Sequence, residues 1–187
     1  MKYIVGGIAL VLVVVAFIAI IISLVFRDSE PIELTEVARL SDVIDGSSEV
    51  ILTTYGKIVA LEDFRAIRIS VTDSTRMIEI LSGYDGSVIE RLQYANTNDS
   101  YGAFIHALDQ AGYTNTRDFP DEREDGYCPT GRRYVFELLI DNQQAQRTWS
   151  STCRGTEGNF AGNRSLIENL FKAQIPEYRD ITRPVRL

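Results

Sequence analysis

The sequence predicts an α+β fold in which an N-terminal transmembrane helix precedes an antiparallel β-sheet of about six strands, with two to three helices packed on one face. Three observations lead to this prediction. Residues 3–26 contain no charged side chain. Four short runs rich in β-branched residues follow one another between residues 49 and 94. Two later segments, residues 98–111 and 165–174, place apolar residues at helical spacing.

The charge-free run from Tyr3 to Phe26 has 24 residues, which gives about 36 Å of helix against a hydrocarbon core of about 30 Å. It is longer than the apolar region of a cleaved signal peptide and lacks a small-x-small cleavage site, which favours an uncleaved signal anchor. We therefore expect the lipid bilayer to be a partner of residues 3–26.

The orientation of this anchor rests on a nearly tied count of basic residues. Lys2 lies on one side, while Arg27 and Arg39 lie on the other. Large domains cross largely regardless of charge, so we expect residues 1–2 in the cytoplasm and the C-terminal domain outside the cytoplasmic membrane. Residues 27–48 then form a juxtamembrane linker with a short helix, and residues 49–187 form an extracytoplasmic α+β domain.

The predicted sheet starts with a meander, in which Ile67, Ile69 and Val71 alternate with polar residues and should face the core. The strand-like runs span residues 49–60, 65–72, 76–83 and 87–94, followed later by a hairpin of residues 133–140 and 145–152. The first helix should bury the stripe Tyr101, Phe104, Ile105, Leu108 and Ala111. The second should bury Leu166, Ile167, Leu170 and Phe171.

The two cysteines, Cys128 and Cys153, flank the predicted hairpin. A turn centred on residues 142–143 would place Phe136 opposite Trp149 and bring Cys153 near Cys128. We therefore predict a structural disulfide. Two reduced buried thiols or a redox pair are the alternatives, although a redox pair would need a motif such as Cys-x-x-Cys, which is absent.

Several C-terminal segments resemble those of a group of bacterial proteins. They are CPTGRRYVFEL (128–138), TWSSTC (148–153), GNFAGN (158–163) and LFKAQIPEY (170–178). Together they resemble uncharacterised single-pass, membrane-anchored envelope proteins of Saccharibacteria-type bacteria. The resemblance implies an envelope protein, and it implies no activity and no catalytic residue.

The chain's composition excludes some functions. With 26 acidic against 19 basic residues and no basic run, the chain lacks the clustered positive charge on which nucleic-acid binding mainly depends. We expect no nucleic-acid partner. Neither cysteine has another cysteine or a histidine at metal-ligand spacing, which argues against zinc. We expect no catalytic residue, no metal site and no cofactor.

Two constellations nevertheless invite a chemical interpretation. His106, the only histidine, could act as a general base oriented by Asp109, but its helical position turns it away from the apolar stripe and favours a solvent-exposed residue. The acidic loop 118–126 could bind calcium, although an EF-hand starting at Asp121 would place Arg123 and Arg132 where ligands are needed. The alternative is a solvated loop beside the disulfide.

Arginine outnumbers lysine 16 to 3, and Arg68, Arg76 and Arg91 could share one exposed sheet surface with Tyr55 or Tyr94. Arginine and tyrosine make strong contacts at interfaces, so this surface is a possible interaction face; ordinary salt bridges are the alternative. We therefore expect a non-catalytic binding module whose partner is an envelope or surface protein or polymer. An accessory subunit of an envelope assembly and an enzyme with an unrecognised carboxylate site are the alternatives.

Overall fold

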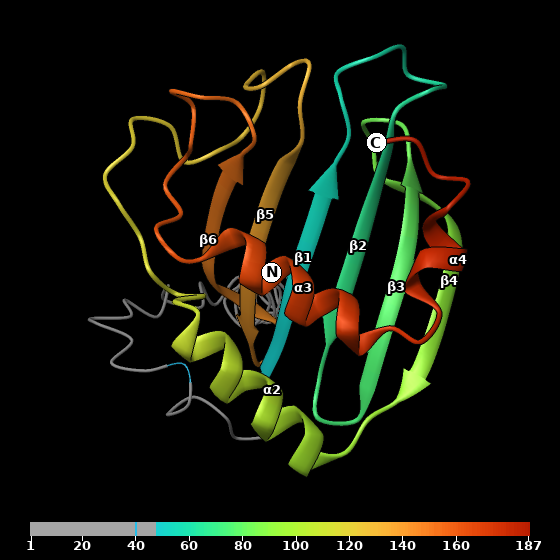
Figure 1. Cartoon of the computed structure of the whole chain (residues 1–187), viewed down its shortest axis with the longest axis vertical. Coiled ribbons are helices and arrows are strands. Elements are labelled where there is room, and N and C mark those ends of the chain that lie inside the picture. Colours follow the sequence, from blue (N-terminus) through green and yellow to red (C-terminus); the bar gives the residue numbers. More distant parts are fainter. Residues whose placement is uncertain (1–39, 41–47) are drawn as a thin grey trace, which may run out of the picture. The chain divides into compact units, whose positions relative to one another are not determined.

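The computed structural model describes residue 40 and residues 48–187, and its centre is a six-stranded antiparallel sheet (Figure 1). The described residues belong to one compact unit, Leu34–Leu187. The strands are β1 (Ser48–Tyr55), β2 (Arg65–Val71), β3 (Thr75–Ser82), β4 (Ser87–Ala95), β5 (Arg133–Ile140) and β6 (Gln143–Ser151). Their order across the sheet is β4-β3-β2-β1-β5-β6, so β1 joins the meander β1–β4 to the hairpin β5–β6. The predicted antiparallel sheet of about six strands is confirmed.

Helices cover one face of the sheet, as predicted. The helices of the described region are α2 (Asn98–Gln110), α3 (Arg164–Gln174) and α4 (Tyr178–Thr182), and α2 and α3 cross the same face (Figure 1). Side-chain caps start both long helices, because Thr97 accepts from the Ser100 N–H and Asn163 accepts from the Leu166 N–H. Phe104 of α2 meets Phe171 of α3 edge to face, at a centroid distance of 5.2 Å.

The sheet's buried face supplies the other half of the core. Leu52, Ile69 and Phe136 are buried there against the helices, and the alternation predicted for Ile67, Ile69 and Val71 is confirmed. The stripe predicted for residues 98–111 is also buried. In α3, Ile167 and Phe171 are buried, but Leu166 is 44% exposed and was wrongly assigned to the core.

The prediction of a transmembrane helix, and with it of a single-pass protein in the cytoplasmic membrane, is corrected. Within residues 48–187 no helix is both long enough and apolar enough to cross a bilayer. The longest of them, α2, has 13 residues, or about 20 Å of helix where a span needs about 30 Å. Residues 3–26, on which the prediction fell, lie outside the described residues, as does most of the linker helix expected before residue 48.

The hairpin β5–β6 has a different register from the predicted one. The turn is at Asp141 and Asn142, whose φ angles of 52° and 62° are those of a tight two-residue hairpin loop. A bulge between Leu138 and Leu139 then shifts the pairing, so that Phe136 lies opposite Thr148 and Val135 lies opposite Trp149. Phe136 and Trp149 therefore point to opposite faces of the sheet.

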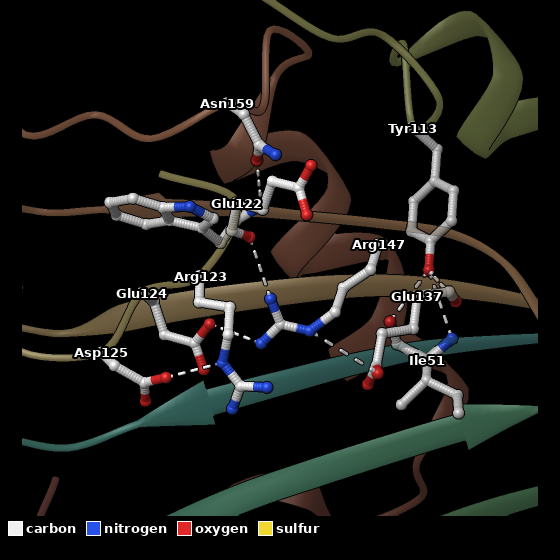
Figure 2. Close-up of polar contacts among 10 residues, drawn as sticks. Ile51, Tyr113, Glu122, Arg123, Glu124, Asp125, Glu137, Arg147 and Asn159 are labelled. Atoms are coloured by element: carbon white, nitrogen blue, oxygen red, sulfur yellow. Dashed lines mark hydrogen bonds and ion pairs between the residues drawn. The ribbon is translucent and has the colours of Figure 1, made fainter. Parts of the chain in front are cut away.

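The Tyr113 side chain, on the helix-covered face of the sheet, forms hydrogen bonds to the backbone of both β1 and β5 (Figure 2). Its hydroxyl accepts from the Ile51 N–H at 3.2 Å and lies 2.9 Å and 2.8 Å from the carbonyl oxygens of Ile51 and Glu137, to which its single hydrogen can be donated. Burial raises the pKa of this phenol well above its ordinary value. Burial also raises the pKa of Tyr178 to about 12.

Cys128 and Cys153 form a disulfide, as predicted. The bond links the loop before β5 to the end of β6. Gly131 lies beneath it, and a β-carbon there would come within 2.6 Å of the Cys128 sulfur. The glycine therefore allows the loop to pass close to the bridge.

Reduction of this disulfide should destabilise the fold. The cysteines are 25 residues apart, and closing a loop of that length removes about 3 kcal/mol of chain entropy from the unfolded state. We expect the Cys128→Ser/Cys153→Ser protein to lose about that much free energy of unfolding in urea titrations. Oxidised and double-serine proteins with equal unfolding midpoints would contradict the assignment of a stabilising bridge.

Alkaline pH should weaken the fold through the buried tyrosines. Their folded-state pKa values exceed the ordinary value, so their contribution is fully present below pH of about 10 and is lost as the pH rises through the folded values. Tyr113→Phe should cost about 1 kcal/mol at pH 7. The variant should then lose less stability than the parent protein between pH 10 and pH 12, measured by urea unfolding. Parallel losses in the two proteins would exclude Tyr113 as a source of the effect.

Candidate functional site

The face of the sheet opposite α2 and α3, here called the outer face, carries two groups of charged side chains. Strand register places Arg68, Glu79 and Arg91 in one row across β2, β3 and β4. In the next row, Glu137 of β5 lies opposite Arg147 of β6. The period-two alternation of each strand puts all five on this face.

Glu79 is the centre of the first group. Its side chain is 4% exposed, with Arg91 Nη2 2.6 Å from one carboxylate oxygen and Arg68 Nη1 3.5 Å from the other. The carboxylate thus separates two guanidinium groups that would otherwise repel each other. Both arginines share this one carboxylate, so the three side chains together keep one uncompensated positive charge.

Arg76 does not join this row. It lies opposite Tyr94 and Val71, in register with the residues of the helix-covered face. Its guanidinium donates to the Ala95 carbonyl from Nε at 3.1 Å and from Nη2 at 2.8 Å. The structure therefore brings Arg68 and Arg91 together, as predicted, and places Arg76 on the other side of the sheet.

Arg147 is the centre of the second group, which Figure 2 shows. It pairs with Glu124, donates to the Glu122 carbonyl at 3.2 Å, and has its Nε 4.0 Å from the Glu137 carboxylate. Next to it, Trp149 donates its indole N–H to the Asp121 carbonyl at 3.0 Å. Arg147 and Trp149 together hold the acidic loop 118–126 against β6.

Three of the five carboxylates of the acidic loop are directed to separate partners. Asp121 accepts from the Tyr127 hydroxyl, Glu124 pairs with Arg147, and Asp125 pairs with Arg123 at 2.7 Å. An open hollow of about 620 Å³ lies among residues 120–127. In the part of the chain that the structure describes, no cluster of three or more histidine, cysteine or acidic side chains is placed to hold a metal ion.

His106 and Asp109 also have separate partners. His106 is exposed and its Nε2 lies 3.2 Å from the Gln110 side-chain nitrogen. Asp109 instead accepts from the Leu40 N–H at 3.0 Å. The structure does not bring the two into the base-and-orienter arrangement that general-base catalysis requires.

A third feature lies at the end of the sheet where β1 turns into β2 and β3 turns into β4 (Figure 1). Six of the seven large apolar side chains that are exposed in the described residues belong to elements at this end. We call this set the apolar corner. Its members are Ile58, Val59 and Leu61 of the β1–β2 loop, Tyr84 of the β3–β4 turn, and Val88 and Ile89 of β4.

The apolar corner is held in place from both sides. The Tyr84 hydroxyl donates to the Val59 carbonyl at 2.7 Å and accepts from the Val59 N–H at 3.1 Å, which joins the loop to the turn. Beneath it, buried Phe64 stacks on Tyr84 with ring centroids 4.1 Å apart. Tyr55 continues this stack, and the Arg133 guanidinium lies 5.7 Å from the Tyr55 ring centroid.

Four acidic residues are adjacent in sequence to members of the apolar corner. Glu62, Asp63, Asp85 and Glu90 are all exposed, and none belongs to an ion pair within residues 48–187. A ligand at the corner would therefore meet an apolar centre with a negative rim.

Sequence reasoning missed the apolar corner because it assigned residues 56–60 to the first strand, which the structure ends at Tyr55. The signal was present, since residues 58–61 place Ile, Val and Leu in a connection where polar residues are the rule. These side chains are exposed because the β1–β2 loop does not pack on the core. The spacing of apolar residues along the sequence does not reveal this.

The Glu79 row gives a test of the outer face. Glu79→Gln should lower the free energy of unfolding by about 1 to 2 kcal/mol, since it removes the charge that separates two arginines, and partial exposure of both guanidinium groups screens the loss. Glu90→Gln, on the neighbouring strand but exposed, should change it by less than about 0.5 kcal/mol. Equal effects of the two substitutions on the free energy of unfolding in urea would show that the Glu79 carboxylate does not stabilise the fold more than an exposed one does.

Comparison with known proteins gives no family. No family model matches the chain, and no curated protein matches it. A solved structure of sheep galectin-11 in complex with glycerol aligns with 64% of this chain and 78% of its own, at 6% sequence identity and a TM-score of 0.15. A TM-score of 0.15 carries no argument about fold or function. The resemblance to Saccharibacteria envelope proteins stays a prediction.

Proposed function

We propose that the domain of residues 48–187 is a non-catalytic interaction module that binds a protein partner through the apolar corner. One observation carries this proposal: six of the seven large exposed apolar side chains of the described region belong to the two connections and the strand start at one end of the sheet. Scattered exposed apolar residues are normal on a protein surface, but a contiguous group with a polar rim is typical of a binding site.

The construction of the apolar corner supports binding. The Tyr84 hydrogen bonds to Val59 and the stack on Phe64 restrict its side chains before any partner arrives. A partner would therefore lose little free energy to ordering this surface. Aromatic and aliphatic side chains at the centre of an interface, with charged ones at its rim, are also the usual arrangement.

The arginine face predicted from the sequence is a weaker candidate. Arg68 and Arg91 share the buried Glu79, and Arg76 donates to the Ala95 carbonyl on the other side of the sheet. A partner that engaged these arginines would have to compete with contacts already made. The apolar corner has no such competitor among the described residues.

Selection of random peptides displayed on phage against the full chain tests the proposal. We expect enriched peptides whose affinity, measured by fluorescence anisotropy, falls at least tenfold with Leu61→Asp, because the substitution places a charge in the apolar contact. Leu166→Asp is the matched control, since Leu166 is the seventh exposed apolar residue and lies on α3. It should leave the affinity unchanged.

Two outcomes would count against the proposal. One is a selection in which no peptide is enriched over an unrelated acidic domain. The other is a set of binders that respond equally to Leu61→Asp and Leu166→Asp, which would mean that binding does not use the apolar corner.

A further inference from the structure

The two edges of the sheet differ in how their backbone groups are used. At the β6 edge, the Trp149 N–H donates to the Asn159 side chain at 2.7 Å and the Trp149 carbonyl accepts from the Phe160 N–H at 3.0 Å. The connection after β6 thus covers that edge at Trp149, near the end of the strand. On the other side, β4 pairs only with β3 within the described residues. An uncovered strand edge is a template for a further strand.

The hydrogen-bond pattern identifies which groups of β4 face outward. The Asn96 N–H donates to the Ser74 carbonyl at 2.8 Å, and bonded pairs alternate along an antiparallel ladder. Counting back by two residues from Asn96, the hydrogen-bonded pairs are Tyr94 with Arg76, Leu92 with Ile78, and Glu90 with Ile80. The residues between them, Arg91, Gln93 and Ala95, therefore turn their N–H and carbonyl groups away from β3.

One of these outward groups is already used. The Ala95 carbonyl accepts from Arg76, which closes the end of the edge. At the other end a bulge between Ile80 and Leu81 leaves Ile89 without a partner on β3, and its side chain is 59% exposed. Between these limits, no described residue binds the backbone groups of Arg91 and Gln93 or the Ala95 N–H, so these groups can bind an added strand.

We infer that the partner of the apolar corner is an extended polypeptide segment that adds to β4 as a seventh strand, carrying apolar side chains together with lysine or arginine. This inference rests on the proposed function, because Val88 and Ile89 belong both to the apolar corner and to β4. The strand addition supplies directional hydrogen bonds, and the apolar corner supplies contact area for alternate side chains of the segment.

Charge complementarity selects a basic segment. Glu62, Asp63 and Asp85 are adjacent in sequence to members of the apolar corner, and Glu90 follows Ile89 but lies on the helix-covered face opposite Ile80. All four are unpaired within the described residues. Basic side chains in the incoming strand would meet this negative rim. A second copy of the chain would bring the same four acids and a net charge of −7 to the contact, so repulsion opposes pairing of β4 with itself.

The test uses a nine-residue fluorescent peptide in which valine alternates with lysine, titrated onto the full chain by anisotropy. Gln93→Pro removes an outward N–H and no bond to β3, so the fold should persist and affinity should fall at least about fivefold. Gln93→Thr is the matched control and should stay within about twofold. The same peptide methylated on alternate backbone nitrogens should also bind at least about fivefold more weakly to the parent protein, whatever the variant does to folding.

The outcomes separate this inference from the proposed function. Binding that Leu61→Asp abolishes, but that survives both Gln93→Pro and peptide methylation, would reject strand addition and leave the apolar corner as the binding surface. Equal affinity for a peptide with glutamate in place of lysine would overturn the basic partner. No binding of the valine–lysine peptide to the parent protein, or a dimer that Gln93→Pro disrupts, would overturn the inference as a whole.

Discussion

The pairing of β1 with β5 is the contact on which the rest of the fold depends. It joins segments that are far apart in the sequence, with Tyr55 opposite Arg133 and Ser48 opposite Ile140. Without it the meander β1–β4 and the hairpin β5–β6 would be two small sheets, each too narrow to cover α2 and α3. Tyr113 sits on this junction and bonds the backbone of both strands. A contact of this range is expensive in chain entropy, because a long stretch of chain must close before the two strands can pair.

The two faces of the sheet are stabilised by different interactions. The helix-covered face is apolar, and its free energy comes from burial of side chains such as Phe136 and Phe171. The outer face uses paired charges, with Glu79 and Glu124 each nearly buried against arginine. Desolvation offsets much of the attraction between such paired charges, so they add little stability. We expect them to favour the register in which Arg68, Glu79 and Arg91 lie opposite one another.

Sequence patterns were sufficient for the strands, the long helices and the disulfide, because each depends on local spacing or on two residues alone. Ile67, Ile69 and Val71 alternate in the sequence and are buried in the structure, and the helical stripe at Tyr101 and Phe104 behaves likewise. The errors arose where the position of a single residue determines the pairing register of a whole strand. The turn at Asp141 and the bulge at Leu139 reset the partners of β6, and a single-residue shift moves every side chain to the other face.

The candidate site was less predictable than the fold for a physical reason. Arg76 was placed with Arg68 and Arg91 because all three are basic and lie on neighbouring strands. Side chains alternate between the two faces along β3, however, and this alternation places Arg76 on the helix-covered face. The apolar corner requires knowing that the β1–β2 loop and the β3–β4 turn end at the same side of the sheet. The face on which Arg76 lies and the shared location of the two connections both follow from pairing between strands. The periodicity of a single segment contains neither.

The β4 edge, which pairs with no further strand of the described residues, has a consequence for how the protein behaves on its own. An open strand edge beside apolar side chains is where chains of a β-protein aggregate into larger assemblies. In β4 the bulge at Ile89 interrupts the ladder, and Glu90 and Arg91 place opposite charges next to each other at the centre of the strand. These features disfavour pairing between the β4 edges of two molecules. The acidic surface keeps separate molecules apart in dilute solution, so solubility should fall as salt screens that repulsion.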